Sequence, residues 1–258
     1  MTGLKLRDHH VLVTGAGSGI GAAIARTLHA EGAKVTLAGR RATPLEELAQ
    51  ELGERVFAAS GFDVTDASAI ETGLASTRDV FGPVTILVNN AGQAPSAPFE
   101  KTTLELWEDV LAVDLTSVFR VTRAVLPELK AHGEGARIIN VAPTAGLTGY
   151  AYVSAYCAAK HGVVGLTRAL ARELARSGVT VNAVCPGFTD TPIIRKSIAE
   201  IVARTGRTPE EALTAFTKAN PQGRLITPEE VADTVLWLAS PAASSINGQA
   251  IAVAGGEI

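Results

Sequence analysis

The sequence predicts an α/β fold with a doubly wound parallel sheet and helices on both faces of that sheet. Two observations predict it. Short apolar runs of strand length alternate with amphipathic segments of helix length along the chain. Hydrophobic residues make up 47% of the 258 residues and aromatic residues only 5%, which is typical of buried parallel strands and tightly packed helices. Strict alternation of strand and helix favours right-handed crossovers, which place helices on both faces.

Seven apolar runs are predicted as strands, at residues 10–14, 35–37, 56–59, 86–88, 138–141, 179–184 and 250–253. No linker, repeat or low-complexity segment separates them, so a single domain over residues 1–258 is expected. The alternation is interrupted once, between Phe188 and Leu225, and the helix after it is expected to start after Thr227 and Pro228. A long insertion of this kind is typical of a lid, here about residues 188–225.

Charge and composition argue against several classes of function. The net charge of -3 and the absence of a basic stripe argue against nucleic acid as a partner. No apolar run reaches the roughly 18 residues that span a bilayer, and MTGLKLRDHH lacks the apolar stretch of a secretory signal, so a cytoplasmic protein without a membrane partner is expected. Cys157 and Cys185 fit no metal or redox spacing and are interpreted as small buried thiols, and no metal site is expected.

A glycine-rich loop follows the first predicted strand. The sequence TGAGSGIG, residues 14–21, connects that strand to an amphipathic helix that is expected to run to about Ala30. Glycines let the backbone turn tightly and approach a pyrophosphate, which the positive N-terminus of the helix attracts. A plain turn is the alternative interpretation, but the position between a strand and a helix favours a nucleotide site.

The order of four motifs resembles the short-chain dehydrogenase/reductase family. TGxxxGIG is followed by NNAG at residues 89–92, by Tyr156 and Lys160, and by Pro186 and Gly187, and the match runs from about residue 8 to residue 256. The resemblance implies a seven-stranded Rossmann fold that binds NAD(H) or NADP(H). The cofactor residues it implies are Gly15, Ser18, Gly19, Ile20 and Gly21 at the diphosphate, Asp63 and Val64 at the adenine, Asn90, Ala91 and Gly92 at the ribose, and Pro186, Gly187 and Thr191 at the nicotinamide.

The choice of cofactor is expected to depend on the end of the second strand, where an acidic side chain would bind the ribose 2′-OH and repel a 2′-phosphate. The stretch VTLAGRR has Gly39 at the position that the family makes acidic, followed by Arg40. A guanidinium can bind a phosphate through two hydrogen bonds. NADP(H) is therefore the predicted cofactor; NAD(H) is the alternative if Arg40 and Arg41 are ordinary exposed charges.

Tyr156 and Lys160 are four residues apart and so share one face of a helix. A nearby ammonium stabilises a phenolate, so Lys160 is expected to make Tyr156 a usable acid and base. The alternative is a packed tyrosine beside a solvated lysine. The resemblance implies that Tyr156 exchanges a proton with the substrate oxygen while Lys160 also holds the cofactor ribose, in an oxidoreductase that interconverts a ketone and a secondary alcohol.

Pro143 departs from the family pattern. The family has a catalytic serine thirteen residues before the tyrosine, and proline offers neither a side-chain donor nor a backbone N–H. A lost donor of this kind costs about 10² to 10³ in rate. Thr144 is expected to point to the opposite face of the strand, and Ser154 does not share a helix face with Tyr156, so neither is a convincing replacement.

Asp114 is the second departure, because the family usually has an asparagine there that helps to hold a water leading to the lysine. Aspartate keeps the shape and loses the two amide donors. Its charge would favour the protonated form of Lys160 and shift the pH dependence of proton transfer. A harmless polar replacement is the alternative. Asp114, Pro143, Tyr156 and Lys160 are thus the candidate catalytic positions.

Three functions stay open. The first is a ketone/alcohol oxidoreductase whose activity is impaired or altered by Pro143. The second is a weakly active or inactive dinucleotide-binding scaffold, natural or engineered at residue 143. The third is a reductase of substrates that are protonated more easily than ketones, such as imines, because these need the serine less.

The substrate pocket is expected to be mostly apolar. Its candidate walls are Gln93, Ala94, Pro95, Ala145, Gly146, Leu147, Tyr150 and Phe188. A 3-oxoacyl or 3-hydroxyacyl thioester is one candidate substrate, because basic residues outnumber acidic ones between Thr191 and Arg224, although a solvated helix face would also explain this excess. These charged residues are Arg195, Lys196, Arg204, Arg207, Lys218 and Arg224, against Glu200, Glu210 and Glu211.

The family resemblance also implies a homotetramer. The contacts would involve two long helices, at about residues 107–132 and 154–177, and the C-terminal strand IAVAGG. The small apolar residues expected to suit close helix packing are Ala158, Ala159, Val163 and Leu166.

Overall fold

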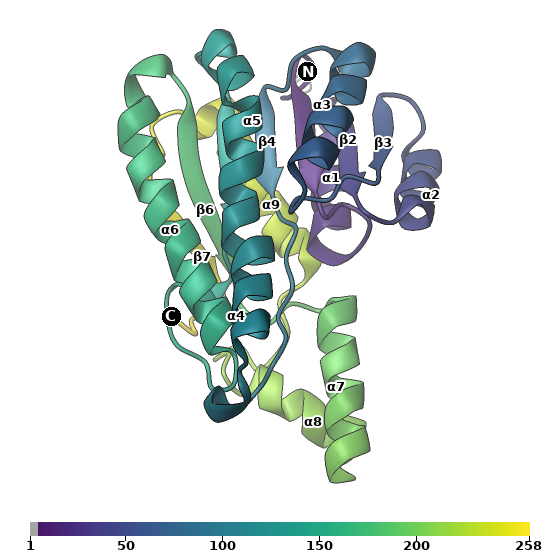
Figure 1. The fold of residues 1–258 in the computed structure, drawn as a ribbon, viewed down its shortest axis with the longest axis vertical. Coiled ribbons are helices and arrows are strands. Elements are labelled where there is room, and N and C mark those ends of the chain that lie inside the picture. Colours follow the sequence, from purple (N-terminus) through teal and green to yellow (C-terminus); the bar gives the residue numbers. More distant parts are fainter. Residues whose placement is uncertain (1–4) are drawn as a thin grey trace.

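The computed structural model describes residues 5–258 and has a seven-stranded parallel sheet at its centre (Figure 1). The strands are β1 (His10–Thr14), β2 (Lys34–Gly39), β3 (Val56–Ser60), β4 (Ile86–Asn89), β5 (Arg137–Val141), β6 (Thr180–Pro186) and β7 (Ala250–Val253). They lie in the order β3-β2-β1-β4-β5-β6-β7. Each predicted strand is therefore confirmed. Residues 1–4 of the predicted domain lie outside the described residues.

The helices cover both faces of the sheet. They are α1 (Gly19–Ala30), α2 (Ala42–Leu52), α3 (Ala67–Phe81), α4 (Leu104–Leu111), α5 (Ser117–His132), α6 (Ser154–Leu174), α7 (Pro192–Thr205), α8 (Pro209–Thr217) and α9 (Pro228–Ala239). A π-helical turn (Ala112–Thr116) joins α4 to α5. The core cluster on one face contains residues of α1, α2 and α9, and the cluster on the other face contains residues of α3, α5 and α6.

Strand β1 shows why its sequence is apolar throughout. Val11 and Val13 belong to the core cluster on the face of α1 and α9, whereas Leu12, between them, belongs to the cluster on the face of α3 and α5. Successive side chains of a strand point to opposite faces, and here both faces are covered. The doubly wound architecture predicted from the alternation of strands and helices is confirmed.

The order of the strands creates a crevice at one edge of the sheet. Strand β1 has β2 on one side and β4 on the other, so the chain leaves the centre of the sheet in both directions. Ligands of open α/β sheets bind at such a switch point, beyond the carboxyl ends of the strands. The loop after β1 and the loop after β4 meet there, and α7 and α8 extend beyond the same edge (Figure 1).

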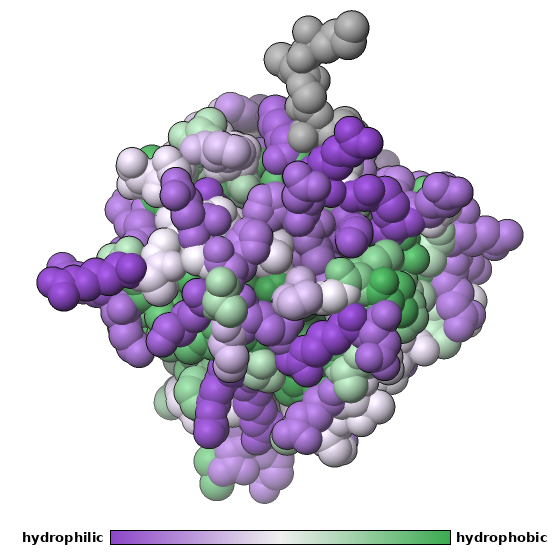
Figure 2. Space-filling model, turned by 90° about the horizontal axis from the view of Figure 1, so that it is seen from above, coloured by the Kyte–Doolittle hydropathy of each residue, from purple (hydrophilic) through white to green (hydrophobic). Residues whose placement is uncertain are grey.

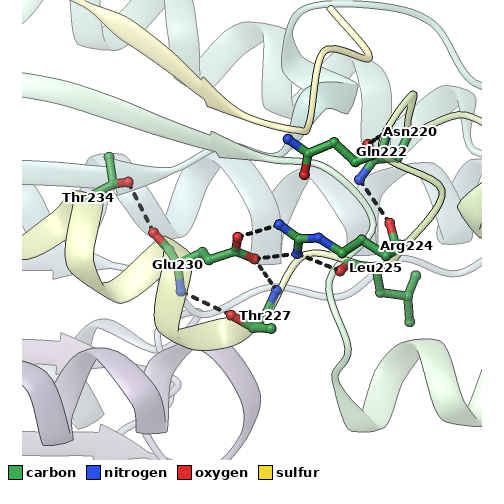
Figure 3. A network of polar contacts seen from close by, with 7 residues as sticks. All are labelled: Asn220, Gln222, Arg224, Leu225, Thr227, Glu230 and Thr234. Atoms are coloured by element: carbon green, nitrogen blue, oxygen red, sulfur yellow. Dashed lines mark hydrogen bonds and ion pairs between the residues drawn. The ribbon is translucent and has the colours of Figure 1, made fainter.

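The segment that carries α7 and α8 returns to the sheet through a polar network (Figure 3). The guanidinium of Arg224 donates two hydrogen bonds to the carboxylate of Glu230, at 2.6 and 2.8 Å. Glu230 also accepts from the backbone N–H of Thr227, whose hydroxyl accepts from the backbone N–H of Glu230. This capping box starts α9 after Thr227, as the sequence predicted.

The end of the molecule opposite α7 and α8 is mostly hydrophilic, with apolar side chains in small groups (Figure 2). No helix within residues 5–258 is long and apolar enough to cross a membrane. One expectation for helix α6 is corrected. Ala159 and Val163 are fully buried against the rest of this chain, so within the expected packing face only Ala158 is exposed and Leu166 is half-buried.

Candidate active site

A cavity of about 1150 Å³ lies at the carboxyl ends of the strands. The residues that the family resemblance implies for the cofactor come from six separate loops and helices, and all of them line this cavity. They are Gly15, Ser18, Gly19, Ile20, Gly21, Arg40, Asp63, Val64, Asn90, Ala91, Gly92, Tyr156, Lys160, Pro186, Gly187 and Thr191. The fold therefore brings together segments that are up to 176 residues apart in the sequence, from Gly15 to Thr191 (191 − 15).

Thr14 and Asn90 fix the backbone at the switch point. The Thr14 hydroxyl accepts hydrogen bonds from the backbone N–H groups of Asn90 and Ala91, both at 3.0 Å. The side-chain amide of Asn90 donates in return to the carbonyl oxygens of Thr14 and Gly15, at 2.9 and 3.2 Å. Gly15 has a φ of 66°, and a Cβ there would lie 2.9 Å from the Cα of Ala91. Only glycine therefore fits this turn.

The adjoining helix terminus suits an anion. Ser18 is the N-cap of α1, but its side chain caps no N–H in the described chain, and the first turn contains no acidic residue. The backbone N–H groups at this terminus carry partial positive charge. Arg40 and Arg41 are exposed on the wall of the same cavity. The residues present therefore fit a dinucleotide that carries a diphosphate and a further phosphate on its ribose.

Asp114 and Lys160 form a buried ion pair. Asp114 Oδ1 lies 3.1 Å from Lys160 Nζ, and the two residues are 0% and 3% exposed. The backbone N–H of Gln93 donates to Asp114 Oδ1 at 3.2 Å. Asp114 lies in the π-helical turn and behind the cavity wall, whereas Lys160 reaches the cavity from α6. The predicted proximity of the two charges is confirmed.

Tyr156 lies on the cavity wall, and Lys160 Nζ lies 5.5 Å from the centre of its ring. Burial raises the pKa of Tyr156, and the Asp114 carboxylate raises this pKa further. The expectation that Lys160 would promote the phenolate is thus corrected, because Asp114 neutralises much of the lysine's charge. Burial also raises the pKa of Asp114, and Lys160 offsets only part of that increase. The arrangement favours Tyr156 in its protonated form.

Pro143 lies on the cavity wall directly after β5 and precedes a short 3₁₀ turn at Thr144–Gly146. Because the chain leaves the strand at Val141, the alternation of strand side chains no longer applies, and Thr144 also lines the cavity. The expectation that Thr144 would point away was wrong. Ser154 is at the start of α6 and does not line the cavity.

The Thr144 hydroxyl belongs to a polar chain that no sequence motif indicated. Thr144 Oγ1 lies 2.6 Å from the Tyr150 hydroxyl, and Tyr150 donates a hydrogen bond to Glu257 Oε1. Glu257 Oε2 is buried and has no hydrogen-bond partner within residues 5–258. Burial and the hydrogen bond to Glu257 raise the pKa of Tyr150. Glu257 lies near the C-terminus in no recognisable motif, so only the structure indicates it.

Most of the predicted pocket walls line the cavity, namely Gln93, Ala94, Ala145, Tyr150 and Phe188. Three do not. Leu147 packs instead against the core cluster that includes Val118 and Val163, which corrects its assignment. Gly146 and Pro95 also lie outside the lining. The Gly146 position is filled from behind, since a Cβ there would lie 2.8 Å from the carbonyl oxygen of Lys160.

Aromatic stacking connects the substrate end of the cavity to α8. The ring of Tyr150 packs edge-on against Phe188, with centroids 5.6 Å apart, and Phe188 packs against Phe216 at 5.2 Å. Tyr152, which the sequence did not indicate, is 65% exposed on the cavity wall and has a φ of 69°. A positive φ is unusual for a tyrosine.

The expected basic excess of residues 191–224 is largely neutralised. Arg195 pairs with Asp190 at 2.9 Å, Arg224 pairs with Glu230, and Lys196 lies 3.9 Å from Glu200. Of the six basic residues, only Arg204 lines the cavity. One guanidinium at the cavity wall, and not a basic surface, is therefore what this segment offers an anionic group.

The fold and the site define an oxidoreductase of the Rossmann class, because an acid/base tyrosine and its lysine adjoin a nucleotide-type loop at the switch point. A sequence model described as short chain dehydrogenase matches residues 9–201. The chain belongs to this family. Within residues 5–258, no group of three histidine, cysteine, aspartate or glutamate side chains could hold a metal ion.

Similar proteins of this family include enzymes that act on oxo and hydroxy acids. The chain is 44% identical over 249 residues to a Streptomyces virginiae protein named as a ketoacyl reductase of the monensin polyketide synthase, covering 95% of both chains. It is 40% identical over 252 residues to D-beta-hydroxybutyrate dehydrogenase from Rhizobium meliloti, covering 95% and 96%. A crystal structure of an actinorhodin polyketide ketoreductase variant with NADPH has a TM-score of 0.91 and 40% identity, covering 96% and 97%.

Proposed function

We propose that this protein is an NADPH-dependent reductase that transfers a hydride to the carbon of a C=O or similar double bond. The observation that carries this proposal is the position of Tyr156 and Lys160 in one cavity with the glycine loop of residues 14–21. The structure solved with NADPH, at 40% identity, supports the same cofactor for this chain.

Three parts of the chain would hold the cofactor. The N-terminus of α1 would bind the diphosphate, and Arg40 would bind the 2′-phosphate. Lys160 would hold a ribose, while Gly187 and Thr191 would border the nicotinamide. NADPH supplies the hydride when it is bound; the chain supplies orientation and the proton.

Tyr156 would donate the proton to the oxygen of a ketone substrate. Its raised pKa keeps the phenol protonated at neutral pH, which suits the direction of reduction. Pro143 offers the substrate oxygen no second donor, so reduction of simple ketones is expected to be slow by about 10² to 10³. The activity is thus proposed to be altered relative to a site that has a serine.

The substrate is proposed to be a medium-sized, largely apolar molecule. The relatives named for ketoacyl reduction and hydroxybutyrate oxidation support an oxoacyl or hydroxyacyl group as one candidate, with Arg204 as the partner of an anionic end. Ile193, Ile194 and Ile201 of α7 line the cavity, which supports a lid function for residues 188–225.

A homotetramer is proposed for the assembly, through the outer faces of α5 and α6. Phe119 on α5 is 49% exposed, and Ala158 and Gly165 on α6 are exposed small residues that would let a second helix approach closely. A monomer in light scattering would contradict this assembly.

The test is to measure NADPH binding first and then loss of NADPH absorbance with a panel of cyclic ketones, 3-oxoacyl thioesters and cyclic imines. Turnover with any of them supports the reductase. Tight NADPH binding without turnover on the whole panel would contradict it and would favour the alternative, a dinucleotide-binding scaffold.

A further inference from the structure

The polar groups around the missing serine differ in kind from a serine, and the inference drawn from them rests on the proposed reductase function. Three polar side chains lie together beyond Pro143, namely Thr144, Tyr150 and Glu257. Because adjacent Cα atoms are about 3.8 Å apart, the Thr144 hydroxyl is a close neighbour of the place that a serine hydroxyl would occupy.

The protons of this chain point away from the cavity and toward Glu257. Tyr150 has one hydroxyl proton, which it donates to Glu257 Oε1. The contact between Thr144 and Tyr150 must then use the proton of Thr144. Both donors are therefore occupied, whereas the Tyr150 oxygen keeps one free lone pair on the cavity wall. The substrate end of the cavity thus offers an acceptor beside Pro143 and no donor there.

Glu257 adds a negative charge behind this acceptor. It forms no ion pair within residues 5–258. The other buried carboxylate at the site, that of Asp114, is paired with Lys160. Glu257 Oε2 has no hydrogen-bond partner in the described chain and lies 2.9 Å from where a Cβ on Gly187 would be. A buried carboxylate without a cation attracts positive charge in a medium of low dielectric constant.

We propose that Tyr150 and Glu257 form a subsite for a protonated nitrogen on the reacting carbon, so that the preferred substrate is an iminium ion. The Tyr150 oxygen accepts the N–H hydrogen bond, and the Glu257 carboxylate behind it balances the charge. A ketone oxygen needs a donor, which Pro143 does not supply; an iminium N–H needs the acceptor that is present.

The reaction balances without a proton from the protein. The iminium carbon gains the hydride, the π electrons of the C=N bond go to nitrogen, and the product is a neutral amine, with NADPH oxidised to NADP⁺. Because the nitrogen is protonated before the substrate binds, neither a serine nor the Tyr156 proton is required at this step. The absence of a serine donor then costs an iminium substrate little.

The test compares a cyclic iminium ion, protonated 3,4-dihydroisoquinoline, with a ketone of the same shape, 2-tetralone. Glu257→Gln keeps an acceptor for Tyr150 and removes the charge. It is expected to lower kcat/KM for the iminium by about 10- to 100-fold, the range of one hydrogen bond to a charged group, and to change kcat/KM for the ketone by less than about threefold. Glu71→Gln, at an exposed position of α3 outside the cavity, controls for the loss of one carboxylate.

Tyr150→Phe is the second variant, since it removes the acceptor and keeps the ring that packs on Phe188. It decides the matter if Glu257→Gln does not fold, and the same selective loss is expected. Reduction of the ketone with equal losses for both substrates, or with no loss, would overturn the iminium subsite and leave the reductase function standing. No reduction of either substrate by protein that binds NADPH would overturn both.

Discussion

The two halves of the cavity are built from different materials. In the nucleotide half, near β1 and β4, backbone groups form the surface, and the side chains of Thr14 and Asn90 serve to hold that backbone. In the substrate half, beyond β5, side chains form the surface, and they come from the loop after β5, from α8 and from the C-terminal segment.

This difference decides how tolerant each half is of change. A surface made of backbone binds what every dinucleotide has, a diphosphate and two riboses, and depends on glycines at fixed positions. A surface made of side chains can change its chemistry with one substitution, as Pro143 and Glu257 illustrate. The nucleotide half is therefore expected to set the cofactor and the substrate half to set the reaction partner.

The largest effect is expected in the substrate half, from Tyr156→Phe. This change removes the acid that a ketone oxygen needs, so kcat/KM for a ketone should fall by about 10³, within the range of general acid catalysis. An iminium substrate should lose less than about tenfold. Steady-state rates with both substrates at saturating NADPH measure the contrast, and NADPH affinity controls for damage to the cofactor site. Equal losses for ketone and iminium would mean that the proton of Tyr156 serves both.

A gain is expected from Pro143→Ser, in the same half. The serine hydroxyl adds a donor at the substrate oxygen, so ketone reduction should rise by about 10². The matched control is Pro143→Ala, which relieves the proline without adding a hydroxyl. Similar rates for both variants would indicate that the backbone at residue 143, and not the missing donor, limits ketone reduction.

The nucleotide half is tested by Arg40→Asp. A carboxylate there would repel a 2′-phosphate, so the dissociation constant for NADPH should rise by about 10- to 100-fold relative to that for NADH. Fluorescence titration with both cofactors gives the ratio. Arg41→Asp is the matched control at the next exposed arginine. A larger effect at residue 41 would assign the phosphate to the other guanidinium.

The boundary between the halves is tested through pH. The Asp114 carboxylate raises the pKa of Tyr156, so Asp114→Asn should lower that pKa. Alcohol oxidation needs the phenolate and rises with pH through the folded pKa; its alkaline rise should therefore move to lower pH in the variant. The pH profile of kcat/KM for oxidation of a secondary alcohol measures this shift. An unchanged profile would show that Asp114 only orients Lys160.

The smallest effect is expected outside both halves, at the base of the lid. The hydrogen bond from Arg224 is the main cause that lowers the pKa of Glu230 from 4.5 to about 2. The stabilisation is present above pH 4.5 and is lost as the pH falls toward 2, because the unfolded state then binds the proton more readily. Glu230→Gln should cost about 1 kcal/mol at pH 7 and nothing near pH 2, since the pair is exposed and screened.

Urea unfolding at both pH values measures this stability. Glu211→Gln is a matched control, because Thr208 and Glu211 form the same capping box on α8 without an arginine in an ion pair. Equal losses in the two variants would assign the effect to the caps and not to Arg224.

The sequence predicted the nucleotide half well for a physical reason. A backbone surface needs glycines in a continuous stretch, so Gly15 and Gly21 can be recognised from local spacing. The substrate half was predicted in part. Tyr150 and Phe188 were indicated by their position near motifs, but Leu147 turned into the core, and Glu257 comes from 107 residues beyond its partner. Contacts between distant side chains leave no spacing to recognise.

Thr144 shows the same limit at short range. The rule that adjacent strand residues face opposite sides holds only while the strand continues, and β5 ends at Val141. The effect of Pro143 on the chain direction could be named from the sequence, but its outcome depends on how residues 144–146 pack against α6.

The π-helical turn at Ala112–Thr116 makes the ion pair of Asp114 depend on chain length as well as on residue type. A π turn holds one residue more than an α-helical turn. Deleting one residue there would let α4 and α5 join as a regular helix, and would rotate α4 relative to α5 by about 100°, the angle of one helical residue. The aspartate would then turn away from Lys160. An insertion or deletion in the gene, and not only a substitution, could therefore create or abolish the charge that keeps Tyr156 protonated.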